Sequence, residues 1–127
     1  MERSVCLAII QKKKLLVEKK GNFWDLPGRK LKADELETEF IFNEIRKEIP
    51  GLNLENLEPY GFFNGKILLR WDPLKSKIYL LKLKANQIIK LGNPELRKIK
   101  WISNLNGCKL SRTVKIVFRL LKDEGYL

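Results

Sequence analysis

The sequence contains no histidine, and this absence narrows the chemistry that the protein can perform. Without an imidazole there is no Ser-His or Cys-His nucleophile pair and no histidine-ligated metal centre. The two cysteines, Cys6 and Cys108, are far apart and form no CxxC pair, so the sequence indicates neither a zinc site nor a disulfide framework. Any metal ion must therefore be bound by oxygen atoms, which favours magnesium, manganese or calcium.

Long apolar runs are missing as well. The apolar stretch near the N-terminus is too short for a signal peptide, and no segment is long enough to span a membrane. We therefore expect a soluble, cytoplasmic protein that does not associate with membranes. The sequence leaves open whether it is a monomer or a homodimer.

Lysine and arginine dominate the charged residues that are present. There are 26 of them against 15 aspartates and glutamates, which gives a formal net charge of +11. Such an excess suits a polyanionic partner such as RNA. An interpretation of equal weight is that the lysines merely solvate the surface, as in proteins from hot environments. The 127 residues fit one domain, residues 1–127, which is long enough to bury a core without disulfide or metal cross-links.

Residue periodicity predicts a mixed α/β domain. Runs typical of strands occur at residues 3–11, 14–18, 23–26, 59–69, 77–84 and 99–103. A helical period follows Asp34, a good N-cap residue, and continues to Pro50, while residues 110–124 form a second amphipathic stretch. Several strands with two amphipathic helices predict a sheet that is covered by helices.

Three glutamates of the first helix are expected on one face. On an α-helical wheel Glu37, Glu44 and Glu48 fall within a narrow arc beside the apolar positions. A row of carboxylates at the edge of the core can bind a hard divalent cation. Taken alone, this pattern is more typical of the solvated face of an amphipathic helix.

Residues 24–52 resemble the signature of the Nudix hydrolases. That signature is a glycine, five residues, a glutamate, seven residues, then Arg-Glu, an aliphatic residue, any residue and Glu-Glu, and it usually follows Leu-Pro-Gly-Gly. The residues in register are Trp24, Leu26, Pro27, Gly28, Glu35, Glu44, Ile45 and Glu48. The order of strands and helices is also similar to that family. The resemblance implies a Nudix-like α/β/α sandwich, in which a mixed β-sheet is flanked by the motif helix and a C-terminal helix.

The resemblance implies an activity and a metal site. The activity is cleavage of a pyrophosphate bond in a nucleoside diphosphate linked to another moiety, by water that a divalent metal activates. Mg²⁺ or Mn²⁺ would be bound by Glu44, Glu48 and the backbone carbonyl beside Gly28, and Glu35 would support the geometry of loop and helix. Glu95 precedes Trp101 in a loop-like context and is a further catalytic candidate, as ligand or general base, although it could equally pair with nearby lysines.

Three positions depart from the signature: Arg29 replaces the second glycine, Asn43 the arginine, and Lys47 the first member of the glutamate pair. At ~4 Å from a dication, exchanging a carboxylate for an ammonium costs on the order of ten kcal/mol if the effective dielectric is near 20. Lys47 must therefore turn outward or act as a built-in cation. We expect Arg29, Lys47 and Arg70 to contact substrate phosphates. The alternative is a catalytically impaired Nudix-like domain that binds nucleotide or RNA.

Overall fold

The computed structural model describes residues 3–49, 52, 54–63, 68–69, 76–84, 87 and 98–127. Its elements in chain order are β1 (Ser4–Gln11), β2 (Lys14–Lys20), β3 (Phe23–Asp25), β4 (Gly28–Lys30), α1 (Glu37–Glu39), the π-helical segment η1 (Phe40–Ile45), α2 (Arg46–Glu48), the 3₁₀ turn η2 (Leu54–Asn56), β5 (Glu58–Phe63), β6 (Leu68–Leu69), β7 (Ser76–Lys82), β8 (Ile99–Ile102) and α3 (Arg112–Asp123). In the described part of the chain, no helix is long and apolar enough to cross a membrane.

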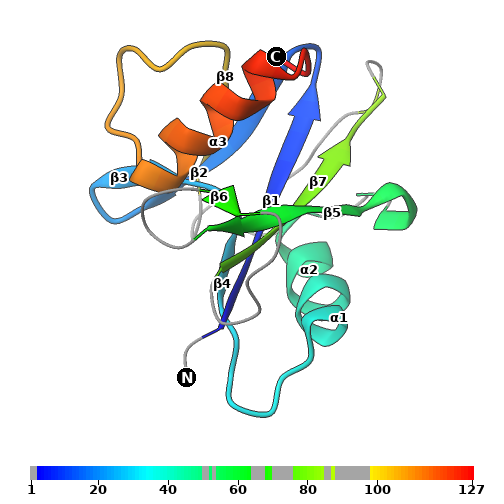
Figure 1. Cartoon of the computed structure of the whole chain (residues 1–127). Coiled ribbons are helices and arrows are strands. Elements are labelled where there is room, and N and C mark those ends of the chain that lie inside the picture. The colour runs from blue at the N-terminus through cyan, green and yellow to red at the C-terminus, as the bar shows by residue number, and fades with distance from the viewer. Residues whose placement is uncertain are drawn as a thin grey trace.

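One mixed sheet forms the centre of the molecule (Figure 1). Its strand order is β3-β2-β1-β7-β5-β6, while β4 pairs with β1 and β8 pairs with β2. β1 and β7 run parallel, from the pair Ser4–Ser76 to the pair Ile10–Lys82. The other strand pairs are antiparallel. The predicted mixed sheet is therefore confirmed.

Alternate residues of β1 point into two separate cores. Val5, Leu7 and Ile9 belong to a cluster with the helical stretch 37–49, whereas Ala8 and Ile10 pack with α3. Because successive side chains of a strand point to opposite faces, the two helical layers cover opposite faces of the sheet. Figure 1 shows α3 across one part of the sheet and the α1–α2 stretch well apart from it. This is the α/β/α sandwich that the sequence predicts.

The first helix differs from its prediction in two respects. It begins at Glu37 with Leu36 at the N-cap and no capping side chain, so the prediction that Asp34 caps the helix is wrong. The physical reason is a turn before the helix, in which the amide of Glu35 donates to the Lys32 carbonyl at 3.0 Å. The segment η1 is π-helical, with hydrogen bonds from i to i+5, so an α-helical wheel does not apply across residues 40–45.

Two smaller differences have local causes. The C-terminal helix begins at Arg112 rather than at Leu110, because the Ser111 hydroxyl accepts a hydrogen bond from the amide of Val114 and so acts as the N-cap. β4 was not predicted, since Pro27-Gly28 is a strong turn signal and the strand has only three residues.

Candidate functional site

Gly28 passes β1 at a distance that leaves no room for a side chain. Its φ is +146°, and it pairs with Cys6 of β1. A Cβ atom added here would lie 2.1 Å from the carbonyl oxygen of Val5 and 2.7 Å from the Cα of Cys6. The carbonyl of the preceding Pro27 accepts a hydrogen bond from the amide of Leu7 at 2.8 Å. Glycine is therefore required at this position of the motif for packing as well as for backbone conformation.

The carbonyl of Gly28 already has a cationic partner. The Lys20 ammonium donates a hydrogen bond to it at 2.8 Å. The same ammonium lies 3.7 Å from a carboxylate oxygen of Glu18 and 3.8 Å from one of Asp25. Glu18 is only 1% exposed and is the one buried charged side chain among the described residues. The predicted backbone ligand of the metal thus faces a lysine in this structure.

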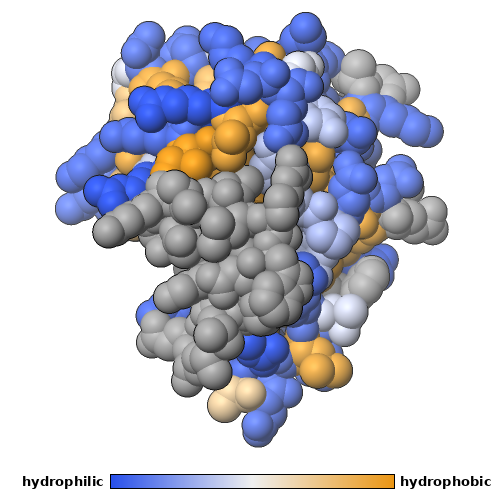
Figure 2. Space-filling view, in the orientation of Figure 1, coloured by the Kyte–Doolittle hydropathy of each residue, from blue (hydrophilic) through white to orange (hydrophobic). Residues whose placement is uncertain are grey.

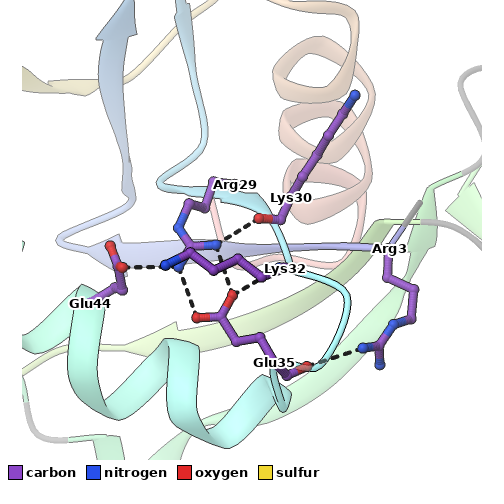
Figure 3. Close-up of polar contacts among 6 residues, drawn as sticks. All are labelled: Arg3, Arg29, Lys30, Lys32, Glu35 and Glu44. Carbon is purple, nitrogen blue, oxygen red and sulfur yellow. Dashed lines mark hydrogen bonds and ion pairs between the residues drawn. The ribbon is translucent and has the colours of Figure 1, made fainter. Parts of the chain in front are cut away.

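Arg29 joins the loop of the motif to its helix (Figure 3). Its guanidinium donates to both carboxylate oxygens of Glu35, each at 2.9 Å, and to Oε1 of Glu44 at 2.9 Å. A further bond reaches the Lys30 carbonyl at 2.7 Å, and the guanidinium carbon lies 4.6 Å from the centre of the Phe40 ring. Two-pronged pairing of this kind fixes orientation as well as charge. The position that we expected to contact phosphate therefore bridges two glutamates of the motif.

Glu35 is held in its ionised form. The hydrogen bonds from the Arg29 guanidinium, followed by that from the Lys32 amide, lower the pKa of the Glu35 carboxyl to about 2. The same pairing raises the pKa of Arg29. Arg3 also donates to the main-chain carbonyl of Glu35 at 3.0 Å, which ties the loop before the helix to the residue before β1. Glu35 thus connects Arg29, Lys32 and Arg3 in this structure, and its supporting role in the motif stays a prediction.

Glu37 and Glu44 turn to different strands. Glu37 accepts a hydrogen bond from the Tyr79 hydroxyl at 2.5 Å and pairs with the Lys77 ammonium at 3.2 Å, both on β7. Glu44 instead pairs with Arg29 of β4, and its side chain is 39% exposed. Glu37 lies in α1 and Glu44 in the π-helical segment that follows it, which explains why an arc drawn for an α-helix does not describe the two glutamates. π-Helical turns are frequent at functional sites, and this one contains Glu44.

Of the other predicted site residues, the structure describes the side chain of only one. Lys47 is exposed on α2. The side chain of Glu48, together with Arg70 and Glu95, lies outside the described residues, so the roles predicted for them stay predictions. Within the part of the chain that the structure describes, no three acidic or cysteine side chains form a cluster that could hold a metal ion.

The oxygen donors of the site nevertheless have the chemistry that Mg²⁺ or Mn²⁺ requires. Carboxylate and carbonyl oxygens are the ligands of hard divalent cations. Glu44 supplies a partly exposed carboxylate beside Arg29. The Gly28 carbonyl could join it only if the Lys20 ammonium moved away.

The group around Lys20 was missed by sequence reasoning. Lys20 and Glu18 lie outside the motif, and Asp25 is not one of its matched positions. The atom that Lys20 contacts is a main-chain carbonyl, which carries no signature in a sequence. One signal was present: Glu18 directly follows the apolar run Leu15–Val17 in a buried strand. A carboxylate at such a place needs a partner, because an unpaired buried charge is costly.

Solved structures with a similar fold include Nudix hydrolases. No protein-family model matches the sequence, and no curated protein sequence matches it. MutT, from a structural study of the Aliivibrio salmonicida and Vibrio cholerae proteins, is 18% identical with a TM-score of 0.68 over 97% of this chain and 98% of that one. The MutT Nudix hydrolase of Burkholderia pseudomallei is 18% identical with a TM-score of 0.66 over 93% and 95%.

A third similar structure contains bound ligands. It is the bifunctional NMN adenylyltransferase/ADP-ribose pyrophosphatase of Francisella tularensis in complex with AMP and a manganese ion. It is 17% identical with a TM-score of 0.63, and the match covers 96% of this chain and 41% of that one. Together these likenesses establish the Nudix-like α/β/α fold.

Proposed function

We propose that this protein is a Nudix-type hydrolase that cleaves a pyrophosphate bond in a nucleoside diphosphate linked to another moiety, with Mg²⁺ or Mn²⁺ as cofactor. The observation that carries the proposal is the bridge from Glu35 through Arg29 to Glu44, which joins the loop and the helix of the degenerate motif. Solved relatives of the fold include hydrolases, and one of them was crystallised with AMP and manganese.

Different residues would bind the metal ion, orient its ligands and contact the phosphates. Glu44 and, by resemblance, Glu48 would hold the metal ion. When bound, such an ion polarises the phosphate and lowers the pKa of water. Arg29 keeps the Glu44 carboxylate aimed at the loop, and the exposed Lys47 is free to reach a phosphate from the rim of the helix. Glu95 and Arg70 remain the further candidates for a general base and a phosphate contact.

The proposal is tested by turnover and by metal binding. Nucleoside triphosphates, dinucleoside polyphosphates, nucleotide sugars and capped RNA would be screened with Mg²⁺ and then Mn²⁺. Millimolar metal should raise the melting temperature, because an ion that binds only the folded state stabilises it. The pair of changes Glu44→Gln and Glu48→Gln should abolish both the shift and the turnover. Glu39→Gln, an exposed change on the same helix, is the matched control and should alter neither.

A second candidate is supported by the cations that surround the site. Lys20 holds the Gly28 carbonyl, Arg29 holds Glu44, and Lys47 replaces an expected glutamate. A Nudix-like domain with impaired catalysis that binds nucleotide or RNA through its basic surface fits these features. Figure 2 shows hydrophilic residues over much of the described surface on one face. Measurable binding of a nucleotide or RNA without turnover on any substrate would favour this candidate over hydrolysis.

A further inference from the structure

We infer that the Lys20 ammonium is a built-in cation that takes the place of a divalent ion at the Gly28 carbonyl. The inference rests on the proposed function, because the resemblance that supplies the activity also assigns this carbonyl to a metal. It goes further by giving a role to a residue outside the motif. It also implies that the protein binds one divalent ion fewer than its motif would allow.

The atoms around the ammonium are those that a hard cation would choose. They are a main-chain carbonyl at 2.8 Å, from Gly28, and carboxylate oxygens of Glu18 and Asp25 at 3.7 and 3.8 Å. Oxygen donors of this kind bind divalent cations when no protein cation is present. We call this group, Glu18, Lys20, Asp25 and the Gly28 carbonyl, the lysine cradle.

The cradle is held in position by bonds from neighbouring elements. Oδ1 of Asp25 accepts hydrogen bonds from the amide of Leu26 and from the Ser111 hydroxyl, both at 2.8 Å. These bonds leave Oδ2 as the oxygen nearest to Lys20. Gly28 is fixed by its pairing with Cys6. The carbonyl and the Asp25 carboxylate are thus set by packing and do not depend on Lys20 for their direction.

Burial explains why the ammonium stays where it is. Glu18 is 1% exposed, whereas the Lys20 side chain is 29% exposed. A carboxylate that has lost its water needs a positive partner, and removal of that partner leaves an uncompensated charge. Two carboxylates therefore face one ammonium.

A divalent ion could reach the Gly28 carbonyl only by displacing Lys20 or by lying beside it. Displacement would break the hydrogen bond and both ion pairs, and adjacency would bring like charges together. The carbonyl is therefore closed to the metal as long as Lys20 is present. Any Mn²⁺ that binds should lie at the helix glutamates.

Counting bound Mn²⁺ in the full chain, without substrate, tests the inference. Free Mn²⁺ would be measured by electron paramagnetic resonance during titration of the wild type, Lys20→Met and Lys19→Met. Lys19 is an exposed neighbour on the same strand and serves as the control. Lys20→Met should bind one more Mn²⁺ than the wild type, and adding Asp25→Asn to it should abolish that extra site. An unchanged count in Lys20→Met would overturn the inference.

A second variant covers the case in which Lys20→Met does not fold. Asp25→Asn in the otherwise wild-type chain should leave the Mn²⁺ affinity within twofold, because Lys20 keeps the ion out of the cradle. A loss of tenfold or more would mean that Mn²⁺ enters the cradle despite Lys20, and the inference would be wrong. Neither the Mn²⁺ count nor the Mn²⁺ affinity is measured with substrate. Both results can therefore be interpreted even if the protein does not hydrolyse any of the substrates.

Discussion

Replacing Gly28 by alanine should destabilise the fold where the loop of the motif pairs with β1. The new methyl group would lie 2.1 Å from the Val5 carbonyl oxygen, well inside the 3.0 Å that real Cβ contacts keep. The backbone φ of +146° adds strain of about 1–3 kcal/mol for a residue with a side chain. Overpacking against a paired strand adds about 1–3 kcal/mol more. A loss near 4 kcal/mol would lower the melting temperature by on the order of 15 °C in a domain of this size.

Substitutions at two other glycines distinguish backbone strain from steric conflict. Gly21 and Gly107 also have positive φ, +62° and +82°, but a Cβ at either would have no atom within 4 Å. Gly21→Ala and Gly107→Ala should therefore cost only about 1 kcal/mol each, from backbone strain alone. Thermal melts followed by circular dichroism would compare the three variants. If Gly28→Ala melted within 2 °C of the two controls, the close approach of β4 to β1 would be refuted.

Three further changes test the charges around the helix. Lys47→Glu should raise turnover roughly thirtyfold if about 2 kcal/mol of electrostatic gain reaches the transition state. If Lys47 instead acts as a built-in cation, the same change should lower the rate at limiting metal concentration. A rate within twofold of the wild type would contradict both interpretations. Because the pKa of Glu35 is lowered to about 2, its stabilising contribution is complete above its ordinary pKa of 4.5 and is lost as the pH falls from there towards 2. Urea unfolding over that range should show the loss, and Arg29→Met should flatten it. Tyr79→Phe removes the hydroxyl that donates to Glu37 and should cost about 1 kcal/mol in urea unfolding, and no loss would mean that this bond contributes nothing.

The sequence predicts the sheet and its two helical layers because burial imposes a clear period on them. β1 and β2 are apolar runs joined by a short polar turn, and α3 has its apolar residues on one side. The predicted start of the first helix was wrong, because the turn at residues 32–35 depends on a hydrogen bond from the Glu35 amide to the Lys32 carbonyl. The π-helical segment was also not foreseen. Its extra residue per turn has no signature in the apolar pattern.

For the site, the motif located the loop and the helix but not the contacts between them. Arg29 was expected to contact phosphate because a guanidinium suits bidentate phosphate contacts and this one replaces a glycine in the loop of the motif. In the fold it meets two glutamates, one six and one fifteen positions along the chain. Lys20 was not foreseen at all, since its partner is a main-chain carbonyl. Contacts made through tertiary structure leave no fixed spacing from which they could be predicted.

The parallel pairing of β1 with β7 has a consequence for the order in which the chain folds. Ser4 lies beside Ser76, so the central pair of the sheet can close only after the intervening chain has been made. Loop-closure entropy makes such distant pairings slow relative to the local β1–β2 hairpin. Yet all the residues that meet around Arg29 and in the lysine cradle, apart from the supporting Ser111, precede Ile49. The charged residues of the site would therefore be synthesised before β7, and the sheet on which they lie would be completed only when β7 pairs with β1.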